Sequence, residues 1–391
     1  MIKPALRVAV VTGSRAEYGL LYWLLHDLRD APDIELQLLV TGMHLSHEFG
    51  LTVNEIERDG FQVTRRVEML LSSDTPGSIA KSIGLGIIGM SDALEQMRPD
   101  IVLLLGDRFE ILAAAQACLV HNIAVAHIGG GDTTEGAIDE SIRHAISKMS
   151  HLHFVTNALA ARRVRQLGED PARIHEVGNP GLDHVRRLPL LAPAALAQSL
   201  GADLGKRNLL VTFHPVTLEP AESEQQFNAL LAALDQRDDD TVLWITRPNA
   251  DSGGRALSSM LDAWAATRSD RVHVYTSLGQ LRYLSLLAHA DAVVGNSSSG
   301  LCEAPSFGTP TVNIGNRQLG RLAGPSVYHC APDQESIQAA IDAALASGRH
   351  TTTNPYGDGQ TASRIIQVLR QMPPTDTLMK KRFHLVGESC A

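Results

Sequence analysis

Short apolar runs alternate with longer amphipathic or alanine-rich segments along most of this chain, and this alternation strongly limits its fold. Continuous runs of Val, Ile and Leu are typical of strands buried on both faces, and therefore of parallel sheets. Helix-like segments such as Tyr18–Arg29, Phe109–His121 and Glu140–Met149 lie between the runs, which predicts βαβ units with right-handed crossovers. The predicted strands are Arg7–Thr12, Glu35–Thr41, Ile101–Gly106, Ile123–Ile128, His151–Thr156, Leu209–Phe213, Val242–Thr246, Val272–Tyr275, Ala292–Gly295 and Thr311–Ile314.

One interruption divides the pattern. No strand-like run occurs across Arg186–Arg207, where Pro189 and Pro193 punctuate the sequence. At about 150 residues per domain, 391 residues suggest two or three domains. We therefore expect two Rossmann-like α/β domains, 1–185 and 186–372, followed by a tail, 373–391, to which the sequence assigns no role. Ligands of such sheets bind outside the carboxyl ends of the strands, so two facing parallel sheets would form a central cleft.

Charge and composition exclude several classes of protein. The 43 acidic and 34 basic residues give a net charge of −9, and no Lys/Arg stripe suits a nucleic-acid backbone. With 44% hydrophobic and 20% charged residues, the chain can form large cores and is not disordered. No apolar run approaches the roughly 18 residues of a membrane span. The apolar core Val8–Val11 is too short for a signal peptide and is typical of a first strand.

The cysteines are far apart and form no CxxC pair, which indicates neither a zinc cage nor a disulfide framework and fits a reducing cytoplasm. They are Cys118, Cys302, Cys330 and Cys390. His151 and His153 share one face of a predicted strand, but no third ligand lies at a suitable spacing, so we expect no metal site.

Two motifs that contain glycine precede the predicted strand Ile101–Gly106. Gly13 permits a tight turn after the first strand, Ser14 can cap the next helix, and that helix start with Arg15 would suit an anion. An ordinary βα turn with a surface arginine explains the same residues equally well. The sequence Gly84–Gly89 matches GxGxxG, but no strand precedes it, so close helix packing explains it better than a dinucleotide.

Charged residues follow two predicted strands. Asp107 and Arg108 follow strand Ile101–Gly106, where they either serve a ligand or form a local ion pair, and we favour the first. The segment His127–His144 is the densest in chemistry-bearing residues, because three glycines lead into acids, a histidine and an arginine. A helix starting near Ala137 would pair Asp139 with Arg143, and Glu140 with His144, at i,i+4 spacing. Carboxylates, histidine and arginine at a strand end suit acid–base work on an anionic substrate.

The second half repeats this arrangement at three strand ends. Pro215 keeps His214 extended at the end of its strand, and Asn249 and Asp251 follow strand Val242–Thr246. The run Asn296–Gly300 follows strand Ala292–Gly295, and its serines with the start of the next helix form a candidate diphosphate cradle. Glu303 lies about one turn into that helix, where its negative charge suits ribose hydroxyls better than phosphate. A polar loop with a helix cap is the alternative.

These motifs resemble the hydrolysing UDP-N-acetylglucosamine 2-epimerases of sialic acid synthesis and the similar epimerases of legionaminic acid synthesis. The matching segments are VTGSRAEYGLL, VTGMHLSHEFG, LGDRFE, HIGGGDTTEGAIDESIRHAISKMSHLHF, VGNPGLD, FHPVTLE, PNADSGG and GNSSSGLCEAPSFGTPTVNIGNRQLGR. They occur in the family's order from residue 8 to about residue 321. The resemblance implies a fold like that of two-domain, glycosyltransferase-B-like enzymes, a UDP-sugar substrate, no cofactor, no membrane or nucleic-acid partner, and a homo-oligomer, either dimer or tetramer.

The resemblance also implies roles for individual residues. Those expected to hold UDP are Arg15, Arg108, His214, Asn249, Asp251, Ser297, Ser298, Glu303 and Arg317. Those expected near the sugar are Asp107, His127, Asp139, Arg143 and Asp183. Many relatives carry a carboxylate two residues past the histidine, where this chain has Gly129, and Asp132 or Glu135 are the candidates to replace it.

The implied reaction couples loss of the sugar C2 proton to departure of UDP from C1, which gives a 2-acetamidoglycal. Water then adds at C1 and a proton returns to C2 on the opposite face. We expect Asp107, Asp132 and Asp139 to share the acid and base roles and His214 to assist UDP departure. The first substrate considered is UDP-N-acetylglucosamine, and the alternative is UDP-N,N′-diacetylbacillosamine. Three rival functions are a UDP-sugar glycosyltransferase, a non-hydrolysing epimerase and an inactive nucleotide-sugar sensor.

Overall fold

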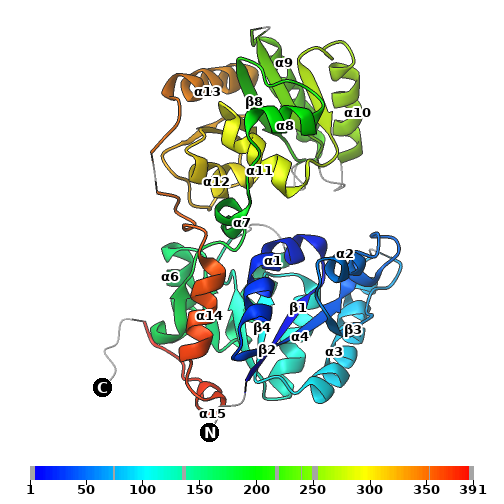
Figure 1. The fold of residues 1–391 in the computed structure, drawn as a ribbon, viewed down its shortest axis with the longest axis vertical. Helices are drawn as coiled ribbons and strands as arrows, with labels where there is room; N and C mark the ends of the chain where they lie inside the picture. Colours follow the sequence, from blue (N-terminus) through cyan, green and yellow to red (C-terminus); the bar gives the residue numbers. More distant parts are fainter. Residues whose placement is uncertain are drawn as a thin grey trace. The chain divides into compact units, whose positions relative to one another are not determined.

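The chain forms two compact units, each built on one parallel sheet (Figure 1). The computed structural model describes residues 5–73, 75–133, 138–215, 220–238, 240–248, 254–351 and 353–386. Unit 1 comprises Met1–Asp183 and Gly359–Ala391, and unit 2 comprises His184–Asp358. The predicted α/β class with parallel sheets is confirmed.

Unit 1 carries a seven-stranded sheet in the order β3-β2-β1-β4-β5-β6-β7, with every neighbouring pair parallel. Its strands are β1 (Leu6–Thr12), β2 (Ile34–Thr41), β3 (Val63–Val67), β4 (Ile101–Leu105), β5 (Ala124–Ile128), β6 (Leu152–Val155) and β7 (Ile174–Glu176). The central strands β4 and β5 are buried at every position, which explains why they are apolar throughout apart from His127 in β5.

Helices cover both faces of this sheet. Alternate residues of β1 point to opposite faces, so that Val8 and Val10 pack with α1 and α14, while Ala9 and Val11 pack with α3 and α4. The helices of unit 1 are α1 (Arg15–Asp30), η1 (Gly42–Leu45), α2 (Val53–Arg58), α3 (Pro76–Met97), α4 (Phe109–Val120), α5 (Ile138–Met149), α6 (Ala158–Gln166), η2 (Pro171–Arg173), α14 (Thr361–Gln371) and α15 (Thr375–Leu378). Helix α7 (Leu182–Arg187) spans the division between the units.

Unit 2 repeats the same plan with six parallel strands in the order β10-β9-β8-β11-β12-β13. They are β8 (Arg207–Thr212), β9 (Thr241–Thr246), β10 (Val272–Tyr275), β11 (Ala292–Gly295), β12 (Thr311–Ile314) and β13 (Val327–Cys330). Its helices are α8 (Pro193–Leu200), α9 (Pro220–Asp235), α10 (Gly254–Ala265), α11 (Gly279–His289), α12 (Ser299–Cys302), η3 (Ala304–Phe307) and α13 (Gln334–Ser347). Both sheets therefore have the strand order of Rossmann-like domains.

All ten predicted strands are present, with ends that differ by up to two residues, and three further strands were not predicted. The additional strands β3, β7 and β13 all lie at sheet edges, where one side is open to solvent or loops. Their sequences, such as VTRRV in β3, are amphipathic or short and lack the apolar run of a buried strand. The GxGxxG sequence lies inside α3, where Gly86 packs against Met69 and Gly89 against Val67, so the predicted helix packing is confirmed.

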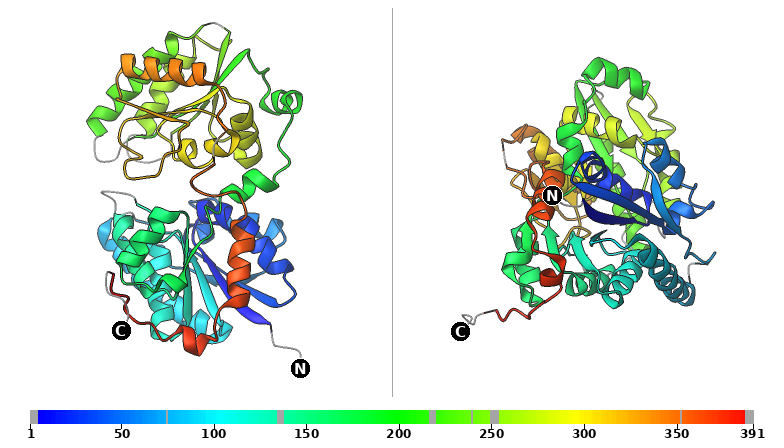
Figure 2. Two further views of the ribbon diagram at one scale, coloured as in Figure 1. Left: turned by 90° about the vertical axis from the view of Figure 1, so that its left-hand side faces the viewer. Right: turned by 60° about the horizontal axis from the view of Figure 1, so that its bottom comes forward.

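The C-terminal segment differs from the expected division. From Gly359 onward the chain belongs with unit 1, and α14 lies along it in both Figures 1 and 2. The reason is an apolar stripe on α14, in which Ile365, Ile366 and Leu369 join the core that α1 and β1 form. Leu378 in α15 is fully buried in the same core, so much of the predicted tail is packed structure.

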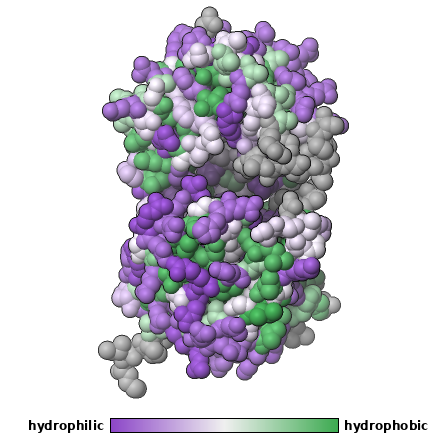
Figure 3. Space-filling view, turned by 90° about the vertical axis from the view of Figure 1, so that its right-hand side faces the viewer, coloured by the Kyte–Doolittle hydropathy of each residue, from purple (hydrophilic) through white to green (hydrophobic). Residues whose placement is uncertain are grey.

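Several large apolar side chains of unit 1 are nevertheless exposed. They include Leu85 and Ile88 on α3, and Leu119 and Val120 at the end of α4. Figure 3 shows apolar patches between hydrophilic residues on the surface of this unit. None of the helices within the described residues is long and apolar enough to cross a membrane.

Candidate active site

The carboxyl end of β4 carries the central ion pair of the candidate site. Gly106, at φ +81°, turns the chain out of β4 so that Asp107 follows directly. The Asp107 carboxylate pairs with the Arg143 guanidinium of α5, whose side chain is only 6% exposed. Arg143 also donates to the Asp132 carbonyl at 2.7 Å and to Glu140 at 3.0 Å. The structure therefore joins the ends of β4 and β5 to α5 through one buried arginine.

Asp139 lies in the first turn of α5, near this ion pair. Burial and the negative charge of Asp107 raise its pKa above the ordinary range, and Arg108 and Arg143 oppose this shift. The site thus holds two carboxyl groups in different environments, because Asp107 is ion-paired with Arg143 while Asp139 is destabilised in its charged form. Such a pair can divide the roles of acid and base. The predicted i,i+4 contact between Glu140 and His144 is confirmed at 3.2 Å.

His127 is fully buried behind these strand ends. Its Nε2 lies 2.7 Å from the Gly106 carbonyl and must donate the proton, so Nδ1 accepts from the Ser147 hydroxyl at 3.0 Å. Burial lowers the pKa of His127 to about 3, which keeps the ring neutral. Gly130 is required beside it, because a Cβ there would lie 2.7 Å from Ser147 Oγ. With both nitrogens used, the ring supports the Gly106–Asp107 turn from behind.

The segment after β5 contains Gly129, at the position where many relatives carry a carboxylate. Gly129 has φ +82°, a left-handed conformation in which a side chain is strained. Asp132, the first candidate to replace the missing carboxylate, accepts a hydrogen bond of 2.7 Å from Thr156 Oγ1, and Asn157 Nδ2 lies 3.5 Å away. Glu135, the second candidate, lies outside the described residues.

Arg108, predicted to bind UDP, lies beside two buried acids. It donates to both carboxylate oxygens of Glu110, at 2.9 and 3.2 Å, and lies 3.9 Å from Glu17. The Glu110 side chain is fully buried, and burial raises the pKa of Glu17 to about 8. The Arg108 side chain is one-third exposed, so it is bound to the two acids on one side and accessible to solvent on the other.

The start of α1 has the predicted helix cap, while its predicted anion-binding role stays a prediction. Ser14 caps the helix by accepting from the Glu17 amide at 3.4 Å, as predicted. The Glu17 carboxyl accepts from the Gly13 amide at 2.7 Å, so that donor is already used. Arg15 is largely exposed and pairs with Glu55 at 3.4 Å.

In unit 2 the ends of β8 and β11 are joined through one buried amide. The Asn296 side chain accepts from the His214 amide at 2.7 Å and donates to the His214 carbonyl at 2.8 Å. Gly295 permits this approach, because it has φ +141° and a Cβ there would lie 1.9 Å from the Thr212 carbonyl. Arg317 and Gln318 donate to the Asn296 carbonyl at 3.3 and 2.8 Å. His214 and Arg317, both predicted to bind UDP, are therefore both hydrogen-bonded to Asn296.

The serine run leads into a shorter helix than expected. Ser298 precedes α12, which ends at Cys302, and Ser297 Oγ accepts from the Ser299 amide at 3.4 Å. Glu303 lies where α12 passes into η3. Its Oε2 is buried and has no hydrogen-bond partner among the described residues, and burial raises its pKa. A buried carboxylate oxygen without a donor suits a ligand hydroxyl.

Asp183 occupies a different environment from the other predicted residues. Its carboxylate is almost completely buried and accepts from the Thr361 and Ala362 amides, both at 2.8 Å. These amides begin α14, so Asp183 caps that helix. Asn249 and Asp251 lie outside the described residues.

Sequence reasoning missed three supporting residues: Glu110, Asn296 and Tyr283. Tyr283 lies on α11, and the Glu303 charge and burial raise the pKa of its phenol. Asn296 directly follows β11, so a polar side chain at a buried strand end could have identified it. Glu110 lies in the first turn of α4, next to Arg108, and that proximity is its only sequence signal. Tyr283 has no such signal, because it lies within a helix.

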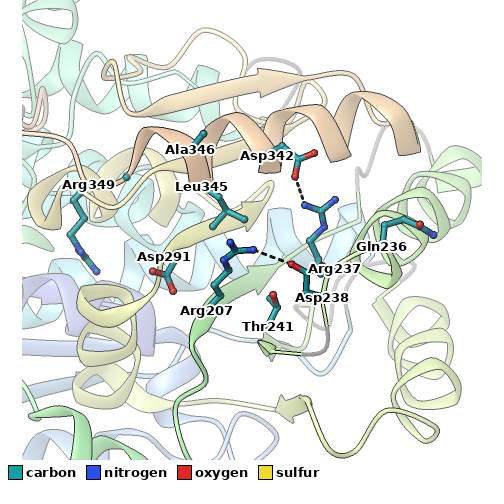
Figure 4. A pocket seen from close by; sticks show the side chains of 11 residues that line it. Arg207, Gln236, Arg237, Asp238, Thr241, Asp291, Asp342, Leu345, Ala346 and Arg349 are labelled. Atoms are coloured by element: carbon teal, nitrogen blue, oxygen red, sulfur yellow. Dashed lines mark hydrogen bonds and ion pairs between the residues drawn. The ribbon is translucent and has the colours of Figure 1, made fainter.

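Unit 2 also contains a separate cavity of about 450 Å³ at the amino ends of β8 and β9 (Figure 4). Its arginines are engaged, since Arg207 pairs with Asp238 at 3.2 Å and Arg237 with Asp342 at 2.5 Å. It lies at the opposite end of the strands from His214. No group of three His, Cys, Asp or Glu side chains suited to a metal occurs within the described residues.

Comparisons with known proteins show the family of this chain. The family model for UDP-N-acetylglucosamine 2-epimerase matches residues 26–370. The chain is 40% identical over 316 residues to the GDP/UDP-N,N′-diacetylbacillosamine 2-epimerase (hydrolyzing) of Campylobacter jejuni, which covers 81% of this chain and 82% of that protein. It is 36% identical over 375 residues to the UDP-N,N′-diacetylbacillosamine 2-epimerase (hydrolyzing) of Legionella pneumophila, covering 96% and 98%.

The fold agrees with a solved structure as well. The crystal structure of UDP-GlcNAc 2-epimerase from Neisseria meningitidis bound to UDP-GlcNAc matches with a TM-score of 0.71 at 18% identity, covering 94% of this chain and 100% of that one. Fold and site thus define a protein of two Rossmann-like units in the glycosyltransferase-B-like class. More narrowly, the chain belongs to the UDP-N-acetylglucosamine 2-epimerase family.

Proposed function

We propose that this chain is a hydrolysing UDP-sugar 2-epimerase whose substrate is UDP-N,N′-diacetylbacillosamine. The observation that carries the reaction type is the carboxyl pair of unit 1, in which Asp107 is bound to Arg143 and Asp139 has a raised pKa. The choice of sugar is supported by the substrate named for the Campylobacter and Legionella relatives. UDP-N-acetylglucosamine is the second candidate substrate, favoured by the description of the family model.

The first half of the proposed reaction is an elimination. Asp139 accepts the C2 proton of the sugar, because a carboxyl with a raised pKa is a stronger base than an ordinary aspartate. The electron pair of the C2–H bond forms the C1=C2 double bond, and the C1–O bond to the diphosphate breaks. UDP leaves with the electron pair of that C1–O bond, and hydrogen-bond donors such as Arg108 and His214 stabilise the growing charge.

The second half is a hydration. Water adds its oxygen to C1, and C2 receives a proton on the face opposite to the first removal. The product is therefore the free 2-epimer of the sugar together with UDP. Asp107 and Asp132 are the candidates to deliver that proton or to activate the water, and the ion pair with Arg143 keeps Asp107 oriented.

Unit 2 provides the proposed nucleotide contacts. Ser297 and Ser298 are assigned to the diphosphate, and Glu303 to the ribose hydroxyls. The buried Glu303 oxygen without a donor among the described residues supports this, because two hydroxyl donors would satisfy it. Asn249, Asp251 and Glu135 remain proposals from the family resemblance alone.

One experiment tests the proposal against its rivals. The protein is incubated in deuterated water with each UDP-sugar in turn and followed by NMR. We expect UDP and a free 2-epimer with deuterium at C2, faster with UDP-N,N′-diacetylbacillosamine. A UDP-linked epimer would indicate a non-hydrolysing enzyme, transfer of an unchanged sugar to an added acceptor a glycosyltransferase, and binding of both without exchange a sensor. The expected cytoplasmic location and homo-oligomeric state stay predictions.

A further inference from the structure

The segment after α14, residues 373–386, is bound to unit 1 along its length, and we name it the C-terminal strap. Leu378 is fully buried in the core. The Arg173 guanidinium donates to the carbonyls of Leu378 and Lys380 at 2.7 and 3.1 Å. The His384 amide donates to the Gly168 carbonyl at 2.8 Å, and Phe383 covers Gly168 so closely that a Cβ there would lie 2.4 Å from the ring. The strap is therefore an integral part of unit 1.

Lys381 of the strap contacts the C-terminal end of α5. Its ammonium donates to the carbonyls of Lys148 and Ser150 at 2.8 and 2.7 Å. Helix carbonyls at this position have no partner within the helix, so a cation here satisfies them and opposes the negative end of the helix dipole. The Lys381 side chain is 20% exposed, which shields these contacts from water.

The same ammonium belongs to a buried charge cluster. Glu169 is 1% exposed and binds Lys381 at 2.7 Å, Lys148 at 2.7 Å and His153 Nε2 at 3.0 Å. Lys148 lies in the last turn of α5 and also lies 4.7 Å from the centre of the Phe383 ring. Strap and helix are thus joined by two lysines that share one carboxylate, in addition to the carbonyl contacts.

The other end of α5 carries the groups assigned to proton transfer. Asp139 is in its first turn, and Arg143, one turn further, holds Asp107. A helix of twelve residues moves as a rod, so a shift or rotation at Met149 also displaces Asp139. A misplacement of about 1 Å in an active site can cost 100-fold in rate.

We propose that Lys381 is a positioning residue: by fixing the C-terminal end of α5, it sets the placement of Asp139 and Arg143 against Asp107. The predicted effect of Lys381 on turnover rests on the proposed function, whereas its predicted effect on the position of α5 does not. Removal of Lys381 leaves Glu169 two partners, so the principal loss is the donor to the α5 carbonyls.

The test compares Lys381→Met with the matched variant Lys380→Met, whose side chain is exposed and adjacent. Hydrogen exchange followed by mass spectrometry is measured over α5, and turnover is measured with the sugar that the wild type uses. For Lys381→Met we expect about tenfold faster exchange in the last two turns of α5. We also expect kcat to fall about 10- to 100-fold with KM within twofold. Lys380→Met should change neither.

A pH profile separates positioning from loss of stability. Burial and then the charge of Asp107 raise the pKa of Asp139, and Arg108 and Arg143 oppose this shift. If α5 moves away from Asp107, the acid limb of the kcat profile should shift to lower pH in Lys381→Met, whereas a merely less stable enzyme keeps the wild-type profile.

Unchanged α5 exchange in Lys381→Met would overturn the proposal, as would faster exchange with wild-type kcat and pH profile. If the wild type converts neither sugar, the proposed function fails, and the exchange measurement alone decides whether Lys381 fixes α5. If Lys381→Met does not fold, the same comparison is made with Lys381→Gln, which keeps a donor for one carbonyl and should be affected less.

Discussion

A substitution of Asp183 can test whether this residue has a structural role or binds substrate. The family resemblance assigns Asp183 to the sugar, whereas the structure places it at the start of α14. Its carboxylate accepts two backbone hydrogen bonds of 2.8 Å and is 1% exposed. Replacement by alanine removes both acceptors and leaves the Thr361 and Ala362 amides unsatisfied. Helix α14 then loses its cap while Ile365, Ile366 and Leu369 must remain buried.

The magnitude follows from these contacts. A hydrogen bond to a charged group contributes about 1.5–3 kcal/mol, and removal of a helix cap costs about 0.5–2 kcal/mol. We therefore expect Asp183→Ala to lose about 3 kcal/mol of stability in unit 1. At roughly 2–4 °C per kcal/mol for a unit of this size, the Tm falls by about 6–12 °C. Asp183→Asn keeps one acceptor and should lose about half as much.

Differential scanning calorimetry measures the Tm, and initial rates measure KM for the UDP-sugar. Asp376→Ala is the matched control, since Asp376 is an exposed aspartate in the same C-terminal part of the chain. The structural role predicts a lower Tm with nearly unchanged KM below the transition. An unchanged Tm together with a KM raised tenfold or more would refute it and return Asp183 to the substrate.

The remaining predictions concern the site, the strap and the surface. Asp139→Asn should lower kcat by about 10²–10⁴-fold in the NMR assay, because an amide cannot accept the C2 proton. Glu303→Gln should weaken UDP binding in calorimetric titration by about tenfold, while kcat at saturation changes little. The pKa of Glu169 is lowered to about 2, so its contribution to stability is full above about pH 4.5 and is lost as the pH falls toward 2. Glu169→Gln should flatten the acid side of the unfolding curve, and equal acid slopes would contradict this. Ile88→Glu, on the exposed face of α3, should lower the mass in analytical ultracentrifugation if α3 forms the expected homo-oligomer interface.

The sequence was most informative where strands are buried on both faces. Strand β4 is apolar at every position and β5 at every position except His127, and their predicted ends agree with the structure within one residue. Edge strands such as β3 and β7 have one open side, so their residues need not be apolar and no run marks them. Which unit α14 joins could not be predicted either, because its apolar stripe fits any open sheet face.

For the candidate site, the sequence predicted which residues lie at the ends of strands but not which of them contact one another. Asp107 and Arg143 were both identified, yet their ion pair joins residues far apart in the sequence and depends on how α5 crosses β4. The local spacing predicted Asp139 as a neighbour of Arg143, whose charge does act on Asp139, but it gave no sign of Asp107. Likewise, the role of Asn296 follows from the close approach of β11 to β8. Gly295 permits this approach, but a glycine at that position does not by itself predict it.

Gly129 occupies the position where many relatives carry a carboxylate. The left-handed backbone there strains any side chain, so the local conformation is one that glycine makes accessible. Asp132 has one oxygen engaged by a hydrogen bond from the Thr156 hydroxyl. For Asp139, burial and the negative charge of Asp107 disfavour the charged form and raise its pKa. Of the three aspartates proposed for acid and base roles, Asp107, Asp132 and Asp139, we therefore propose Asp139 as the proton acceptor, and on that proposal the rigidity of α5 matters for turnover.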